Sequence, residues 1–166
     1  MQLKFSFLYL LIIASLFGGC SKRAAVLDLN DVRMFNPESA DQILFLEFRV
    51  SQPEKGSLEQ ISLVSSVSGT GKLKNLRRPV EYPYRIQVVP RYRTSAFEVP
   101  MIFEHPLFRE VEVPDPSGTI TRKKQFASEG SFTMRMQADP NIEKLDFYSL
   151  KPGQQPVKIY TLNLKQ

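Results

Sequence analysis

Short runs in which apolar and polar residues alternate are the feature that most limits what this 166-residue chain can form. Every second residue from Leu44 to Val50 is apolar, and the same period of two recurs at 84–88, 107–113, 132–137, 145–147 and 157–159. Successive side chains of a strand point to opposite faces, so this alternation indicates strands with one buried face and one face in water. Stretches rich in proline, glycine and aspartate separate the runs and predict turns.

Seven to nine short strands, 12 prolines and no amphipathic helical pattern predict an all-β fold, an antiparallel β-sandwich. We expect an immunoglobulin-like arrangement, with a jelly roll or an open barrel as the alternatives. The chain has no tryptophan and only one cysteine, so the sequence signature of a true immunoglobulin domain is missing. Residues 111–121 predict a hairpin, and the charges of Arg122, Lys123 and Lys124 would protect its open edge from pairing with another chain.

The first 19 residues form a unit of their own. Lys4 is their only charge, and the apolar run from Phe5 to Phe17 is followed by Gly18 and Gly19. This is the three-part pattern of a secretory signal peptide. The apolar run is about 13 residues long, whereas a helix that spans a bilayer needs about 20. The sequence therefore predicts a removable signal over residues 1–19.

The stretch Leu16-Phe17-Gly18-Gly19-Cys20 resembles the lipobox of bacterial lipoproteins, in which a small residue stands directly before a cysteine. The resemblance implies that the Cys20 thiol carries a diacylglyceryl group, that the signal is cut before Cys20, and that the new amino terminus is acylated, for example with palmitate. An ordinary signal peptide with a coincidental cysteine and a buried inert thiol are the alternatives. Two or three acyl chains anchor a protein to a membrane firmly.

Ser21, which stands where some lipoproteins carry aspartate, is similar to the pattern of lipoproteins that move from the inner to the outer membrane. We therefore expect an outer-membrane lipoprotein that faces the periplasm, with display at the cell surface as the alternative. A lipidated tether over residues 20–30 would then precede a sandwich domain over residues 31–166.

The residues that carry catalytic chemistry are scarce. His105 is the only histidine, which leaves too few ligands for a zinc hydrolase, and no G-x-S-x-G sequence is present. Glu110 and Glu112 share one face of a predicted strand, where alternation indicates a solvated surface rather than an acid and base pair. Residues 68–72 lack the spacing of a phosphate-binding loop and predict a turn. We expect no enzyme activity, no metal site and no cofactor beyond the covalent lipid.

One stretch, Arg77 to Arg93, has the composition of an interface. Tyrosine and arginine supply large contact surfaces that can form hydrogen bonds, and tyrosine rings also stack on sugars. The candidate partner-binding residues are Tyr82, Tyr84, Arg85, Arg91, Tyr92 and Arg93. In the alternative interpretation, Tyr84 packs inward beside Ile86 while the arginines face solvent.

The sequence thus predicts a lipid-anchored, non-catalytic sandwich that binds a protein partner, as an accessory or assembly subunit of a cell-envelope complex. A carbohydrate- or peptidoglycan-binding lipoprotein module is the alternative, because sandwich folds host many functions. Nucleic acid is not expected as a partner, since the net charge of +5 is small and the protein is predicted to be secreted.

Overall fold

The computed structural model describes residues 24–54, 56–74, 81–96, 98–114 and 116–165. Its strands are β1 (Ala24–Asp28), β2 (Gln42–Ser51), β3 (Gln60–Thr70), β4 (Arg85–Tyr92), β5 (Met101–Glu104), β6 (Phe108–Pro114), β7 (Ile120–Phe126), β8 (Glu129–Gln137), β9 (Ile142–Leu150) and β10 (Val157–Lys165). A short 3₁₀ helix, η2 (Leu29–Asp31), follows β1. Among these residues, no helix has the length and apolar character needed to cross a membrane.

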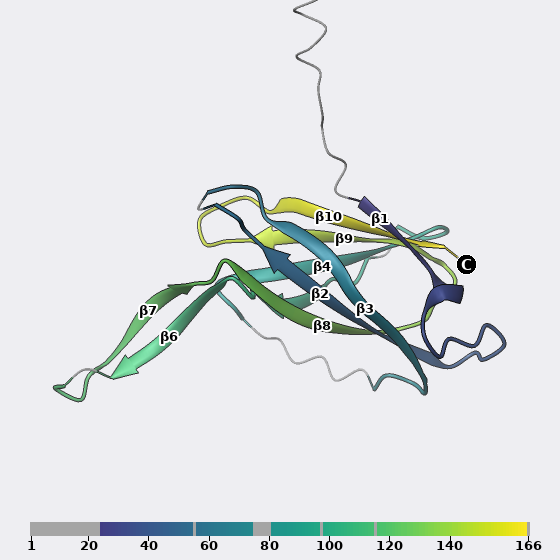
Figure 1. The fold of residues 1–166 in the computed structure, drawn as a ribbon, viewed down its shortest axis with the longest axis horizontal. Coiled ribbons are helices and arrows are strands. Elements are labelled where there is room, and N and C mark those ends of the chain that lie inside the picture. Colours follow the sequence, from purple (N-terminus) through teal and green to yellow (C-terminus); the bar gives the residue numbers. More distant parts are fainter. Residues whose placement is uncertain (1–23, 55, 75–80, 97, 115, 166) are drawn as a thin grey trace, which may run out of the picture.

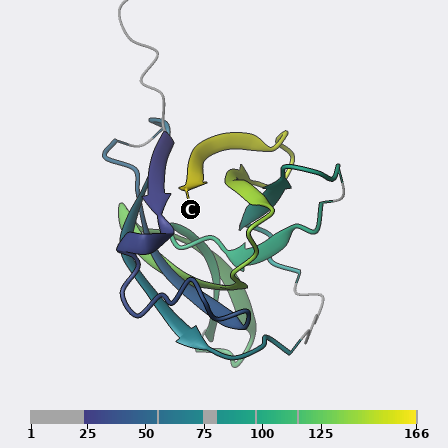
Figure 2. The same cartoon turned by 90° about the vertical axis from the view of Figure 1, so that its right-hand side faces the viewer.

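The strands form two packed sheets and a separate hairpin. One sheet has the order β1-β10-β9-β4-β5 and the other has the order β3-β2-β8, while β6 and β7 pair only with each other. Figure 1 shows this hairpin extending beyond one end of the sandwich, and Figure 2 shows the two sheets curving around a common interior. The predicted all-β sandwich is therefore confirmed.

Part of the strand order matches the plan of an immunoglobulin-like sandwich. The run β10-β9-β4-β5 corresponds to strands G-F-C-C′, and the pair β2-β8 corresponds to strands B-E. Two features are added to this plan. Strand β3 lies at the outer side of β2, and the β6–β7 hairpin is inserted between β5 and β8.

A set of aromatic rings joins the two sheets. Phe48 of β2 is fully buried, and its ring centre lies 4.8 Å from that of Phe147 on β9 and 5.5 Å from that of Phe132 on β8. Tyr160 of β10 packs against Phe147 with ring centres 5.3 Å apart. Leu44, Leu46, Phe48 and Val50 are all buried, as their alternation in the sequence predicts. Apolar burial across this layer stabilises the sandwich.

The structure differs from the expected tether at residues 24–30. Ala24 to Asp28 form β1, which pairs in parallel with β10, so that Ala24 lies opposite Thr161 and Asp28 opposite Lys165. Leu27 and Leu29 are buried in the core. The pairing joins the two ends of the described chain, and a five-residue strand carries too little local pattern to indicate it. Residues 24–30 therefore belong to the folded domain rather than to a tether.

Strand β3 also departs from the sequence prediction, because residues 68–70 belong to its end rather than to a turn. The backbone of Gly69 pairs opposite Ile43, and the turn residue is Gly71, whose φ of 146° suits glycine. The serines of β3 have low strand propensity, and the hydrogen bonds to β2 outweigh it. The run at 107–113 is also divided, since Leu107 enters the core before β6 begins.

Gly130 in β8 lies directly against the backbone of Pro106, in the segment between β5 and the hairpin, where only glycine fits without movement. A Cβ atom at this position would lie 2.8 Å from the Pro106 carbonyl oxygen. We predict that Gly130→Ala lowers the free energy of unfolding by about 1 to 3 kcal/mol, since the backbone of Pro106 would have to move. Urea denaturation measures the change. Gly69→Ala is the matched control, because its Cβ would meet only the Phe45 ring at 3.5 Å. Equal stability of the two variants would contradict the prediction.

Candidate functional site

The β6–β7 hairpin is a two-stranded ribbon with its own cross-strand pairs. Phe108 lies opposite Phe126 at its base, and Glu112 lies opposite Arg122 further out. Every residue of β7 is exposed, including Ile120 at 64% and Phe126 at 47%. A hairpin of two strands is marginally stable without further packing. The packing at its base therefore decides how it is held.

A buried polar cluster lies directly behind the base of the hairpin. His105, which follows β5, is fully buried, and its Nδ1 accepts a hydrogen bond of 3.2 Å from the Leu107 N–H. This bond places the ring proton on Nε2, which donates to Glu59 Oε2 at 3.1 Å. Lys151, just after β9, contacts the other oxygen of Glu59 at 2.5 Å. The loops before β3, after β5 and after β9 are thus joined at one carboxylate.

The Glu59 carboxylate is held in its charged form. Burial by itself raises its pKa, but the hydrogen bonds from His105 and Lys151 outweigh burial and lower the pKa from 4.5 to about 2. The Lys151 ammonium also lies 4.2 Å from the centre of the Phe108 ring, where the face of the ring attracts a cation. Phe108 begins β6, so this contact connects the cluster to the hairpin.

The cluster contains a serine, a histidine and a glutamate, but it does not have the geometry of a catalytic triad. Ser149 Oγ lies 3.3 Å from His105 Nε2, which is the same nitrogen that faces Glu59. A triad needs the nucleophile and the carboxylate on opposite ring nitrogens. Ser149 is also only 3% exposed, so a substrate would not reach it. The cluster positions the hairpin.

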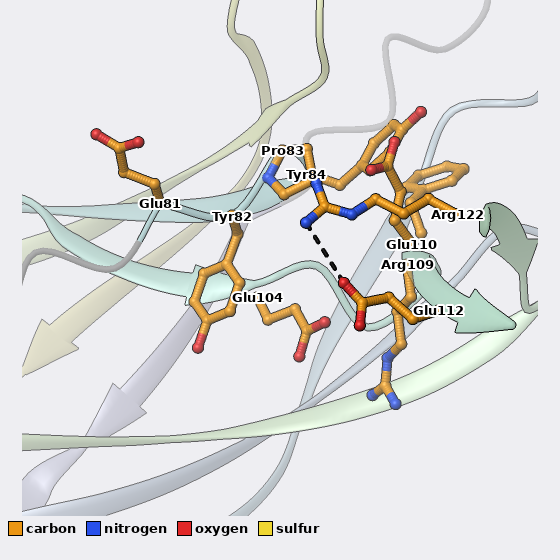
Figure 3. Close-up of a pocket in the computed structure, with 10 residues that line it drawn as sticks. Glu81, Tyr82, Pro83, Tyr84, Glu104, Arg109, Glu110, Glu112 and Arg122 are labelled. Carbon is orange, nitrogen blue, oxygen red and sulfur yellow. Dashed lines mark hydrogen bonds and ion pairs between the residues drawn. The ribbon is translucent and has the colours of Figure 1, made fainter. Parts of the chain in front are cut away.

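A cleft of about 300 Å³ lies between the hairpin and the chain that leads into β4. We call it the hairpin cleft. Its lining residues are Glu81, Tyr82, Pro83, Tyr84, Glu104, Phe108, Arg109, Glu110, Glu112 and Arg122. Figure 3 shows the carboxylates of Glu104 and Glu112 directed into the space between the Tyr82 ring and the arginines of the hairpin.

The lining of the cleft is charged and aromatic, and Arg85 and Lys124 lie opposite two of its glutamates, Glu104 and Glu110, in the strand pairs. Glu112 pairs with Arg122 at 3.4 Å, and both side chains are largely exposed. Glu81, Glu104 and Glu110 form no ion pair with any residue that the structure describes. Tyr84 and Phe108 form one wall, with ring centres 5.6 Å apart. The cleft thus offers charged groups of both signs next to aromatic faces, a combination that suits a sugar.

The structure separates the predicted interface residues into two groups. Tyr82 and Tyr84 line the hairpin cleft, and Arg85 begins β4 opposite Glu104 of β5. Arg91, Tyr92 and Arg93 lie at the other end of β4, about 23 Å from Tyr84 along the strand. Residues from 77 to 80 lie outside the described residues, as does Cys20. The stretch therefore does not form one continuous patch.

The second group is largely structural. Arg91 Nε lies 3.0 Å from Asp146 on β9, and its guanidinium also donates to the Tyr148 hydroxyl and pairs with Glu98. Burial raises the pKa of the Asp146 carboxyl, but hydrogen bonds from Lys158 and Arg91 hold the pKa below its ordinary value. Tyr92 packs against the core, while Arg93 is exposed and its backbone N–H donates to the Asn141 carbonyl.

Several residues of the site were not singled out in the sequence. Glu59, Glu104 and Lys151 are separated from the tyrosines along the chain, and only the packing of loops brings them together. Glu110 and Glu112, expected on a solvated face, are exposed and also line the cleft. In the described part of the chain, no group of three His, Cys, Asp or Glu side chains could hold a metal ion.

Comparisons with protein-family models, with curated proteins and with solved structures gave no match. The class that the structure itself defines is an all-β sandwich with a projecting hairpin.

The charge of Glu59 predicts how stability depends on pH. Because the folded pKa lies below the ordinary 4.5, this stabilisation is present above pH 4.5 and is lost as the pH falls toward 2. We predict that the free energy of unfolding drops over this range by roughly 2 to 4 kcal/mol more in the native chain than in Glu59→Gln. Urea denaturation between pH 2 and 7 measures both curves. Parallel curves for the two proteins would contradict the assignment.

Proposed function

We propose that this chain is a lipid-anchored envelope protein whose non-catalytic sandwich binds a protein partner, as an accessory or assembly subunit of a cell-envelope complex. The projecting β6–β7 hairpin is the observation that carries the proposal. It exposes Ile120 and Phe126 at the two ends of β7, and the structure describes no other element that covers this strand. An extended strand edge with exposed apolar residues is a surface that partners recognise.

The lipid anchor is proposed from the sequence, in which the lipobox-like stretch ends at Cys20. Strand β1 begins only four residues later, at Ala24. Four residues span at most about 14 Å, so a lipid on Cys20 would hold the β1 edge of the sandwich close to the membrane. The outer membrane, with the domain in the periplasm, is the proposed location.

We predict that Cys20→Ser moves the protein from the membrane fraction to the soluble fraction of the envelope, because it removes the thiol that carries the lipid. Mass spectrometry of the amino-terminal peptide should show an acylated Cys20 in the native protein. Ser21→Ala is the control and should remain acylated and membrane-bound. An unmodified amino terminus at another residue would overturn the anchoring proposal.

Partner binding is tested at the hairpin itself. We predict that Ile120→Ser lowers the yield of a cross-linked partner from intact envelopes several-fold, because it removes an apolar contact at the hairpin tip. Leu58→Ser is the matched control, since Leu58 is 61% exposed in the loop before β3 and lies outside the hairpin. Both variants should keep the thermal midpoint of the native protein. A partner captured equally by both variants would place the interface elsewhere.

A carbohydrate- or peptidoglycan-binding function is the second candidate, and the hairpin cleft favours it. Tyr82, Tyr84 and Phe108 offer aromatic faces for stacking on sugar rings, and the carboxylates beside them accept hydrogen bonds from hydroxyl groups. Pull-downs with purified peptidoglycan and glycan arrays separate the two functions. Binding there that is lost in Tyr82→Ala and kept in Ile120→Ser would favour the carbohydrate function.

A further inference from the structure

We propose that the outer edge of β8 pairs with the same edge of a second copy of this chain, which joins two β3-β2-β8 sheets into one antiparallel sheet across a twofold axis. The surface proposed above for an envelope partner lies on the hairpin, so this inference goes beyond the proposed function and does not depend on it. It is carried by the open edge of β8, by the charges along that edge and by a depression beside it.

The outer edge of β8 is open in the part of the chain that the structure describes. β8 pairs with β2 on one side, and no described strand pairs with it on the other. Figure 1 shows it as the outermost strand beside β2. Among the described residues, no loop forms a backbone hydrogen bond with residues 129–137. An unpaired edge exposes a row of N–H and C=O groups, to which another strand can bind.

Several other strand edges are less suited to pairing with a second copy. β1 has five residues and β5 has four. The outer side of β3 is bridged by Arg33, which lies opposite Val67. β7 carries Arg122, Lys123 and Lys124 in succession, so two copies of its edge would repel each other. β8 is nine residues long and carries one charged residue of each sign.

The charges of β8 are self-complementary in one register. Alternate residues of the strand face solvent, and they are Glu129, Ser131, Thr133 and Arg135. When two copies pair antiparallel with Phe132 on the twofold axis, Glu129 of each copy lies opposite Arg135 of the other. The same register places Ser131 opposite Thr133. Because side chains directly opposite each other have Cβ atoms about 4.5 to 5.5 Å apart, both ion pairs can form.

A shift of the register removes this complementarity. With Thr133 on the axis instead, Arg135 would lie opposite Ser131. Glu129 would then lie opposite Gln137, and neither charge would gain an ionic partner. The charges therefore select the register with the ion pairs.

A depression on the solvent face of the same sheet fits Arg135 of the second copy. Its volume is about 270 Å³, and its lining residues are Glu47, Arg49, Val64, Glu129, Gly130 and Ser131. The lining thus holds two glutamates and one arginine, and Arg49 contacts only one oxygen of Glu129, at 3.1 Å. The residues opposite these glutamates in the strand pairs are serines and a threonine, which carry no charge. A guanidinium from the second copy would balance the depression.

The arginine that fills this role is not used within its own copy. Arg135 is exposed and lies opposite Phe45 of β2, and it forms no ion pair with any described residue. Each copy therefore offers one free guanidinium and one acidic depression. The twofold axis brings the two together twice.

The experiment measures self-association of the full mature chain in detergent by sedimentation velocity. We expect a dimer for the native chain. Glu129→Arg and Arg135→Glu should each weaken dimerisation by at least about tenfold, because each places two pairs of like charges in the interface. Glu143→Arg is the matched control, since it makes the same change of charge at an exposed position of β9, and it should dimerise as the native chain does.

An equimolar mixture of Glu129→Arg and Arg135→Glu tests the register itself. In a mixed pair, each reversed charge lies opposite the other reversed charge, and the two native charges also lie opposite each other. The mixture should therefore regain the dimer that each variant loses alone. Recovery would also show that both variants are folded.

Three results would overturn the inference: a native chain that stays monomeric, single variants that dimerise as tightly as the native chain, or a mixture that stays monomeric. Ile120→Ser separates this inference from the proposed function, because it changes the hairpin and leaves β8 intact. It should dimerise normally while it loses the envelope partner. A monomeric native chain that still captures that partner would reject the dimer and keep partner binding.

Discussion

The buried carboxylate of Glu59 is the interaction on which the arrangement of the hairpin depends. It joins His105 and Lys151, and with them the loops before β3, after β5 and after β9. A buried charge is tolerated only when it is paired and fully hydrogen-bonded, and Glu59 has both kinds of partner. Because breaking such a pair leaves an uncompensated charge in the interior, the loops that meet here are held in one arrangement. The hairpin emerges from this fixed base.

The hairpin cleft forms because the cluster around Glu59 holds the base of the hairpin in place. Phe108 contacts the His105 ring on one side and Tyr84 on another, with ring centres 4.6 and 5.6 Å away. Because Phe108 is the first residue of β6, these contacts fix the start of the hairpin relative to the buried cluster. Glu104, at the end of β5, and Glu110 and Glu112, on β6, are then brought to the same space as the tyrosines. A rigid framework beneath an exposed ribbon is the arrangement that binding surfaces commonly have.

The alternation of apolar residues predicted much of the fold because each strand it marked has one face in the core. Leu44, Leu46, Phe48 and Val50 illustrate this. The hairpin around residues 114–118 was predicted from its turn residues instead, and its arms lie outside the core. The local pattern failed where pairing is long-range. Strand β1 is held by the other end of the described chain, and β3 is held by β2 despite its serines. The residues of the predicted interface fall into two groups for a related reason, since six residues of β4, from Arg85 to Pro90, separate Tyr84 from Arg91.

The sequence by itself determined the class of the fold, because side-chain periodicity is a local property. The predicted location of the protein likewise depends only on the local sequence around Cys20. Only the tertiary structure decided which charged residues meet. His105 in the sequence is a lone histidine before a proline, and Glu59 is an acidic residue near a turn. Their meeting in the interior, and the gathering of four glutamates around the tyrosines, depend on the packing of two sheets and their loops. Burial and distance across that packing, rather than sequence spacing, set the electrostatics of the site.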